Sequence, residues 1–81
     1  MNYKFPKDVP VNKVIKVFKK FGFNKIREGN HISFLRKNPD GSNTPMTIPN
    51  HPTIKDSTLR HIINQAGIKR NDFLKIFYKE I

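Results

Sequence analysis

Apolar residues near the start of the chain recur every three or four positions, which is the spacing of one buried helix face. The residues of this face are Val11, Val14, Ile15, Phe18 and Phe21. Pro10 suits the first turn of a helix, where its missing N–H costs nothing, and Gly22 suits the position after the last turn. The pattern therefore predicts a helix over residues 10–21.

Two stretches with strand character follow, Phe23–Glu28 and His31–Lys37, and only two residues separate them. The first of those two residues is a glycine, which favours a tight type II′ hairpin turn. Side chains alternate between the faces of a strand, so Ile32 and Phe34 point one way and His31 points the other way. We expect the apolar pair to face the core.

A third strand is predicted over residues 44–49, after a run of turn-forming residue types at positions 38–43. Met46 and Ile48 alternate inward along it. Pro45 has no N–H to donate to a neighbouring strand, so this strand should lie at an edge of the sheet.

Two more helices complete the chain after a loop at residues 50–55. The second helix should start at a cap supplied by Asp56 or Ser57, and Gly67 followed by Ile68 fits a Schellman ending. Its buried stripe consists of Leu59, Ile62, Ile63 and Ala66. A last helix begins near Asn71. Its inward residues are Phe73, Leu74, Phe77 and Ile81.

The order of elements is helix, three strands, helix, helix, which predicts an α+β fold. Consecutive strands with short connections favour an antiparallel three-stranded sheet, covered by helices on one face and open on the other. The length of 81 residues and the absence of repeats or linkers predict one domain over residues 1–81.

Charge is the strongest feature of the composition: 16 Lys and Arg against 6 Asp and Glu give a net charge of +10. A positive surface of this size favours a polyanionic partner, above all a nucleic acid. The alternatives are a surface that serves solubility or meets an acidic protein. The chain has no cysteine, which fits a reducing cytoplasm and excludes thiol nucleophiles and cysteine-bound zinc. No apolar run is long enough to cross a membrane.

His31 is the best candidate for chemistry, because it would stand on the open sheet face and histidine titrates near neutral pH. A two-residue turn would place Glu28 directly opposite His31, where a carboxylate could orient the imidazole ring. The same register turns Lys25 and Arg27 toward the helices. Either the hairpin tip projects beyond the helices, or a bulge shifts the pairing.

The other candidate residues are less distinctive. His61 belongs to the polar side of the second helix, and His51 lies in a loop where it could serve function or capping. The six carboxylates are scattered without a metal-binding spacing. An enzyme built on this chain would therefore use histidine and cations, with no metal and no cofactor.

Four segments, in order and spacing, resemble the HicA family of toxins: Lys20-Phe21-Gly22-Phe23, Gly29-Asn30-His31, Ile48-Pro49-Asn50-His51, and the run from Thr58 to Ile68. The resemblance covers residues 9–74. It implies a fold similar to double-stranded-RNA-binding domains, and mRNA cleavage that a HicB-like antitoxin blocks by covering the active site. The family's catalytic histidine falls on His31. Asn30 stands where the family has a serine or threonine, and Ser57 replaces a family glycine.

Metal-free RNA cleavage uses the ribose 2′-OH as the nucleophile and needs a base, an acid and positive charge near the phosphate. We expect His31 to act as base or acid. The second proton-transfer group is either His51 or water. Candidates for RNA binding are Arg27, Asn30, Arg36, Lys37, His51 and Lys55.

Two other functions remain open from the sequence. The first is a double-stranded-RNA-binding module without catalysis, although only one arginine stands near the start of the second helix, where such modules carry several lysines. The second is a helix-turn-helix DNA-binding protein. Its recognition helix would be residues 71–80, which are too apolar to contact bases, so we expect no DNA binding by this chain alone.

Overall fold

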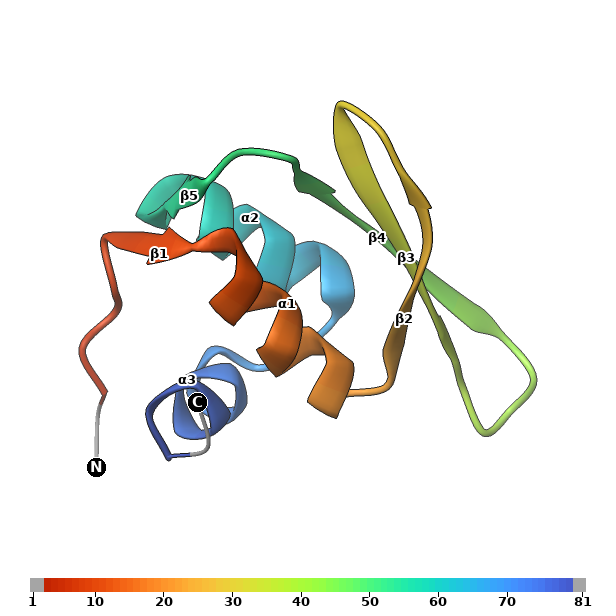
Figure 1. Cartoon of the computed structure of the whole chain (residues 1–81). Helices are drawn as coiled ribbons and strands as arrows, with labels where there is room; N and C mark the ends of the chain where they lie inside the picture. Colours follow the sequence, from red (N-terminus) through yellow and green to blue (C-terminus); the bar gives the residue numbers. More distant parts are fainter. Residues whose placement is uncertain (1–2, 80–81) are drawn as a thin grey trace.

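The computed structural model describes residues 3–79 as five strands and three helices. Figure 1 shows their arrangement along the chain. In order, the elements are β1 (Asp8–Pro10), α1 (Val11–Lys20), β2 (Phe23–Glu28), β3 (His31–Lys37), β4 (Asn43–Pro49), β5 (Thr53–Lys55), α2 (Asp56–Ala66) and α3 (Arg70–Lys79). No helix within these residues has the length and apolar character needed to cross a bilayer.

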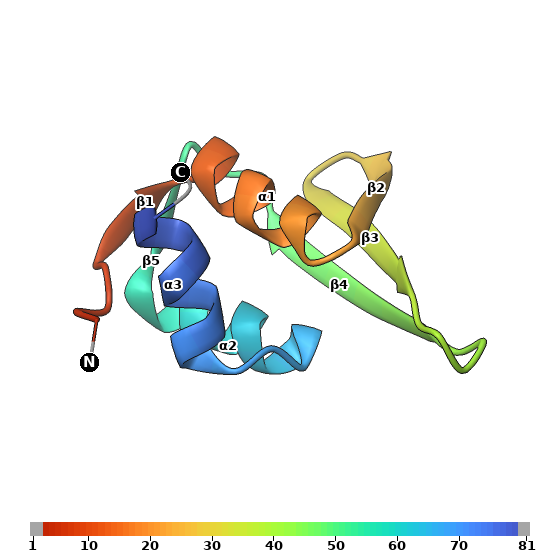
Figure 2. The same ribbon diagram turned by 90° about the horizontal axis from the view of Figure 1, so that it is seen from below.

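The α+β prediction is confirmed: β2, β3 and β4 form an antiparallel sheet in that order, and the helices lie on one side of it (Figures 1 and 2). The core lies between these two layers. Its largest fully buried side chains include Phe18, Phe23, Phe34, Phe73 and Met46. The open face of the sheet is therefore left for contacts outside the core.

The helices match the predicted buried faces with small differences. Val17 is fully buried as well, whereas Ile15 and Phe21 are only partly covered. The Schellman ending of α2 is confirmed, because Gly67 is left-handed (φ 71°) and the Ile68 N–H donates to the Ile63 carbonyl.

The cap of α2 differs from the prediction, whereas α3 starts within one residue of the predicted position. The N-cap of α2 is Lys55, without a side-chain cap, and α3 starts at Arg70. The Asp56 carboxylate instead accepts the N–H of Ser57 from within the first turn. The predicted inward residue Ile81 lies outside the described residues.

A second, two-stranded sheet of β1 and β5 was not predicted. Val9 pairs with Ile54 in it, and both are buried. Each strand offers one apolar residue in three, too little for a local pattern, and the pairing joins segments about 45 residues apart. The Pro52 carbonyl also accepts the first N–H of α1, from Val11, so this sheet fixes the start of the helix.

The β2–β3 hairpin contains a bulge, which moves Arg27 to the open face and leaves Lys25 on the helix side, as predicted for that residue. Lys25 pairs with Phe34 and Arg27 with Ser33, so Ile26 between them is the extra residue and is 62% exposed. The predicted type II′ turn is wrong, since Gly29 does not have a positive φ. The bulge shifts the pairing so that three residues, rather than two, connect the paired strands.

The β3–β4 turn confirms its predicted turn chemistry. Asn38 donates from its amide to the hydroxyls of Ser42 and Thr44. The hydroxyl of Ser42, and then its backbone N–H, donate to the Asp40 carboxylate and lower the pKa of that group below its ordinary value. These short-range bonds hold the distal end of the sheet.

The outer edge of β4 presents few free N–H groups. The N–H of Thr47 donates to the side-chain oxygen of Gln65 on α2, so the N–H of Thr47 points away from β3. Pro45 and Pro49 lie two residues before and after Thr47, so their backbones have the same outward orientation, but proline has no N–H. The edge position predicted from Pro45 is thus confirmed, and the edge is poorly suited to pair with another strand.

Candidate active site on the open sheet face

His31 is the first residue of β3 and is exposed on the open face of the sheet. Ile32 and Phe34 point to the opposite face of β3, are at most 3% exposed and face the helices. The cross-strand partner of His31 is Pro49 at the end of β4. Within residues 3–79 no group forms a hydrogen bond with the imidazole, so both ring nitrogens are open to a ligand.

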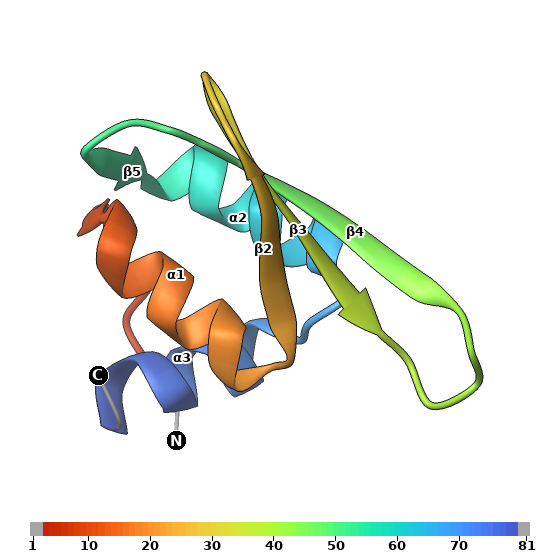
Figure 3. The same ribbon diagram turned by 45° about the vertical axis from the view of Figure 1, so that its right-hand side comes forward.

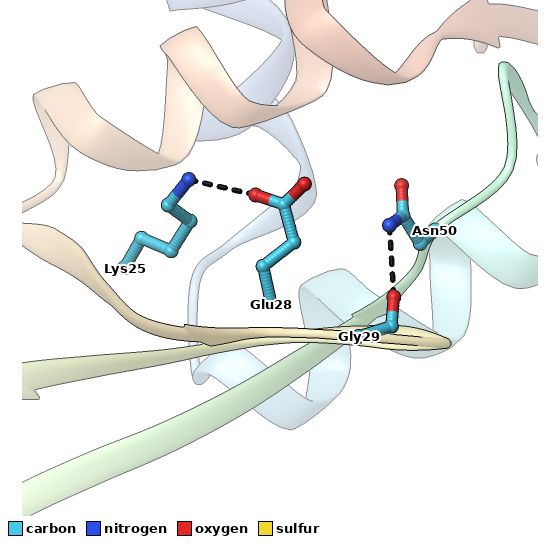
Figure 4. Close-up of polar contacts among 4 residues, drawn as sticks. All are labelled: Lys25, Glu28, Gly29 and Asn50. Carbon is cyan, nitrogen blue, oxygen red and sulfur yellow. Dashed lines mark hydrogen bonds and ion pairs between the residues drawn. The ribbon is translucent and has the colours of Figure 1, made fainter.

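The expected pairing of His31 with Glu28 is wrong. Glu28 pairs with Ile32 and therefore points to the helix side of the hairpin. There its carboxylate accepts from the Lys25 ammonium at 2.7 Å, as Figure 4 shows. The physical reason is the bulge at Ile26, which moves Glu28 by one position and turns it to the other face. The same shift brings Arg27 to the open face.

A shallow hollow of about 240 Å³ surrounds His31 at the tip of the hairpin. Its lining residues are Arg27, Gly29, Asn30, His31 and Ser33. Arg27 is paired with Ser33, which makes it a diagonal neighbour of His31, and such neighbours lie about 7–8 Å apart. The hollow therefore combines one imidazole, one guanidinium and an amide, with no carboxylate among its lining residues.

The hairpin tip projects beyond the helices (Figure 3) but is tied to the β4–β5 loop by Asn50. The Asn50 side chain donates to the Gly29 carbonyl at 2.8 Å (Figure 4), and its backbone N–H donates to the Asn30 carbonyl at 3.1 Å. Sequence reasoning missed this residue. Its signals were its place directly after a strand and its membership of the segment Ile48–His51, which resembles the HicA family. Asn50 fixes the backbone that carries the hollow.

A second hollow, of about 260 Å³, adjoins the first at the His31–Pro49 pair. Pro49, His51 and Lys55 are among its lining residues, together with Thr53 and Thr58. Both His51 and Lys55 are exposed. The loop at residues 50–52 and the end of β5 thus supply an imidazole and an ammonium to this second hollow.

Comparison with known protein families decides the assignment. Residues 11–68 match the family described as the HicA toxin of bacterial toxin–antitoxin systems. The chain belongs to the HicA toxin family. A toxin of a toxin–antitoxin system is the role this membership supports. No curated protein matches the chain significantly.

Two of the predicted cations of this HicA-family chain, Arg36 and Lys37, line neither of these two hollows. Arg36 points to the helix side, where its guanidinium carbon lies 5.0 Å from the centre of the Phe23 ring and its Nε donates to Asn38. Lys37 is on the open face but six residues along β3 from His31, which corresponds to about 20 Å. Arg27 is therefore the nearest predicted cation on the sheet.

The remaining histidine of this HicA-family chain agrees with the sequence-based expectation, since it lies on the exposed side of α2. His61 is exposed on α2 and lines neither of these two hollows. In the described part of the chain, no three His, Asp or Glu side chains come together in a way that could hold a metal ion.

Proposed function

We propose that this HicA-family toxin is an endoribonuclease that cleaves mRNA without a metal ion, with His31 as a proton-transfer residue. The observation that carries the proposal is the exposed imidazole, which has no hydrogen bond to any of residues 3–79, in one hollow with the Arg27 guanidinium. Imidazole moves protons near neutral pH, and guanidinium holds phosphate through a planar fork of N–H groups. Membership of a toxin family supports a reaction that damages the cell.

In this reaction the ribose 2′-oxygen attacks the adjacent phosphorus as the bond from phosphorus to the 5′-oxygen breaks. A base takes the proton of the 2′-OH, and an acid gives a proton to the leaving 5′-oxygen. The products are a 2′,3′-cyclic phosphate and a 5′-hydroxyl. His31 serves as the base or the acid, and the second role falls to His51 or to water.

The two adjoining hollows would bind the RNA on both sides of the cleaved bond. Arg27 lies where it can neutralise charge that develops on the nonbridging oxygens. His51 and Lys55 in the second hollow would hold the neighbouring nucleotide, and the Asn30 amide takes the place of the family's hydroxyl. The requirement for a 2′-OH makes the reaction specific to RNA.

The partner that neutralises this toxin would be a HicB-like antitoxin that covers the hollow at His31. A net charge of +10 favours an acidic surface on that partner as much as it favours RNA. Toxin, antitoxin and mRNA would meet in the cytoplasm.

Incubation of the purified chain with single-stranded RNA in EDTA tests this function. We expect fragments that end in a 2′,3′-cyclic phosphate, and no cleavage of an RNA with a 2′-O-methyl group at the cleaved position. Binding without fragments would instead support an RNA-binding module without catalysis.

Arginine-to-glutamine substitutions at positions 27 and 36 should separate the two faces of the sheet. Arg27→Gln removes the guanidinium from the hollow, and we expect the cleavage rate to fall by about 10²-fold, as for loss of one charge-stabilising donor. Arg36→Gln removes the same group from the helix side and should leave the rate of the folded protein within about threefold. Initial rates on one RNA substrate provide the measurement. Equal losses at both positions would contradict the placement of Arg27.

Asn50→Ala should loosen the hairpin tip. The change removes the side-chain bond to the Gly29 carbonyl, which is exposed, so we expect a loss of about 0.5–1.5 kcal/mol in the free energy of unfolding. The cleavage rate should fall by more than this loss of stability explains, because the hollow loses its fixed backbone. Urea unfolding and cleavage assays on the same preparation measure both effects. An unchanged rate would remove Asn50 from the positioning of the site.

A further inference from the structure

A third hollow, of about 170 Å³, lies apart from the sheet. It is lined by Phe5, Arg60, Ile63, Asn64 and Arg70, which come from the N-terminal segment, α2 and the start of α3. Phe5 precedes and Arg70 follows residues 11–68, the part of the chain that matches the HicA family. The hollow is therefore completed by segments outside the family match.

The N-terminal segment is held in place at this hollow by contacts with α3 and β5. The Tyr78 hydroxyl donates to the Lys4 carbonyl at 2.6 Å, and the rings of Tyr3 and Tyr78 stack with their centres 5.7 Å apart. Further along, Val9 pairs with Ile54. Phe5 between these points is only 8% exposed and belongs to the core.

Two arginines share the Phe5 ring. The guanidinium carbon of Arg60 lies 4.7 Å from the ring centre, and that of Arg70 lies 4.8 Å from it. Neither arginine forms an ion pair with an acidic side chain in residues 3–79. A guanidinium stacked on a ring uses its face and keeps the N–H groups of its edge for a planar anion. Both arginines line the same hollow, where their N–H groups can meet an anion.

The hollow also has an apolar wall. Small parts of the Phe5 and Ile63 side chains, which are 8% and 2% exposed, line the hollow beside the two guanidinium groups and the Asn64 amide. Apolar cavities of about 150 Å³ bind a molecule as large as benzene. The space is therefore large enough for one apolar side chain, and the two arginines that line it can hold a carboxylate next to that side chain, which is a combination that acidic peptides provide.

We propose that this hollow binds an acidic peptide segment of a partner protein, with a carboxylate on Arg60 and Arg70 and a neighbouring apolar side chain against Phe5 and Ile63. Charge complementarity carries the choice of occupant, since two cations over one aromatic ring, neither of them paired with an acidic side chain of residues 3–79, favour an anion. RNA is the weaker candidate, because base stacking needs an exposed aromatic face and the Phe5 ring is buried beneath the arginines. The proposal is independent of the reaction at His31.

Titration of the unaltered protein followed by ¹H–¹⁵N NMR decides the proposal. The probe is an acetylated and amidated Glu-Leu-Glu-Glu peptide, and the comparison peptide has glutamine in place of each glutamate. We expect the acidic peptide to move the amide signals of Phe5, Ile63 and Asn64, and the glutamine peptide to bind at least tenfold more weakly. No movement of these signals, or equal binding of both peptides, overturns the proposal. So does a 12-nucleotide single-stranded RNA that moves them when the peptide does not.

A pair of double variants locates the contact. Arg60→Gln with Arg70→Gln should weaken binding of the acidic peptide at least tenfold. Lys16→Gln with Lys19→Gln, which removes two exposed charges from α1, should change it less than twofold. Equal weakening in both variants would indicate general charge attraction and overturn the proposal. The titration of the unaltered chain stands even where the arginine variant does not fold.

Discussion

His31→Ala is expected to lower the rate of RNA cleavage by about 10²–10⁴-fold while the fold stays intact. The imidazole is exposed and makes no hydrogen bond within residues 3–79, so its removal opens no cavity and leaves no buried group unpaired. The loss should therefore appear in catalysis alone. Cleavage rates, together with urea unfolding curves, measure the two properties separately.

His61→Ala is the matched control, because His61 is also an exposed histidine but lies on α2. We expect its cleavage rate to equal that of the unaltered protein. In cells, induced expression of the unaltered chain should arrest growth, and His31→Ala should abolish this arrest. A folded His31→Ala protein that cleaves RNA at the rate of the His61→Ala protein would remove His31 from the mechanism.

Phe18→Ala is expected to cost about 3–5 kcal/mol of stability, the range for a buried phenylalanine. Phe18 is fully buried and contacts the rings of Phe23, at 5.8 Å between centres, and Phe73, at 5.1 Å. A chain of 81 residues has a total stability of about 4–12 kcal/mol. The substitution therefore removes a large part of the stability, and toxicity should fall through loss of folded protein.

Phe21→Ala is the control for this prediction, since Phe21 is the C-cap residue of the same helix and is only partly buried. It should cost clearly less than Phe18→Ala when both are measured by urea unfolding. Similar losses for the two variants would show that the core does not depend on the ring of Phe18.

The main elements could be predicted from the sequence because their patterns are local. The strands Phe23–Glu28 and His31–Lys37 were predicted with the bounds that the structure has, and the Schellman ending at Gly67 follows from two residue types. The pair of β1 and β5 could not be predicted, since its strands are too short for a pattern and meet only through the fold.

The candidate site was predictable in part. The position of His31 on the open face follows from its alternation with Ile32 and Phe34 along the strand. The register of the residues on β2 depends instead on a bulge at Ile26, and isoleucine is not a residue type that indicates a bulge. Arg27 therefore joined the site and Glu28 left it. Arg36 was misplaced for a simpler reason, since alternation along β3 already puts it on the side of Phe34.

The unequal edges of the three-stranded sheet limit how copies of this protein can aggregate. Along β4 the prolines and the Gln65 amide leave no N–H free between residues 45 and 49 for an incoming chain, whereas β2 is the other outer strand. In two molecules that joined through β2, the three-stranded sheet of each molecule would have only its β4 edge left, which has few N–H groups to offer. Growth of this sheet into a fibre needs two edges that accept strands, so strand pairing at this sheet would stop at two molecules.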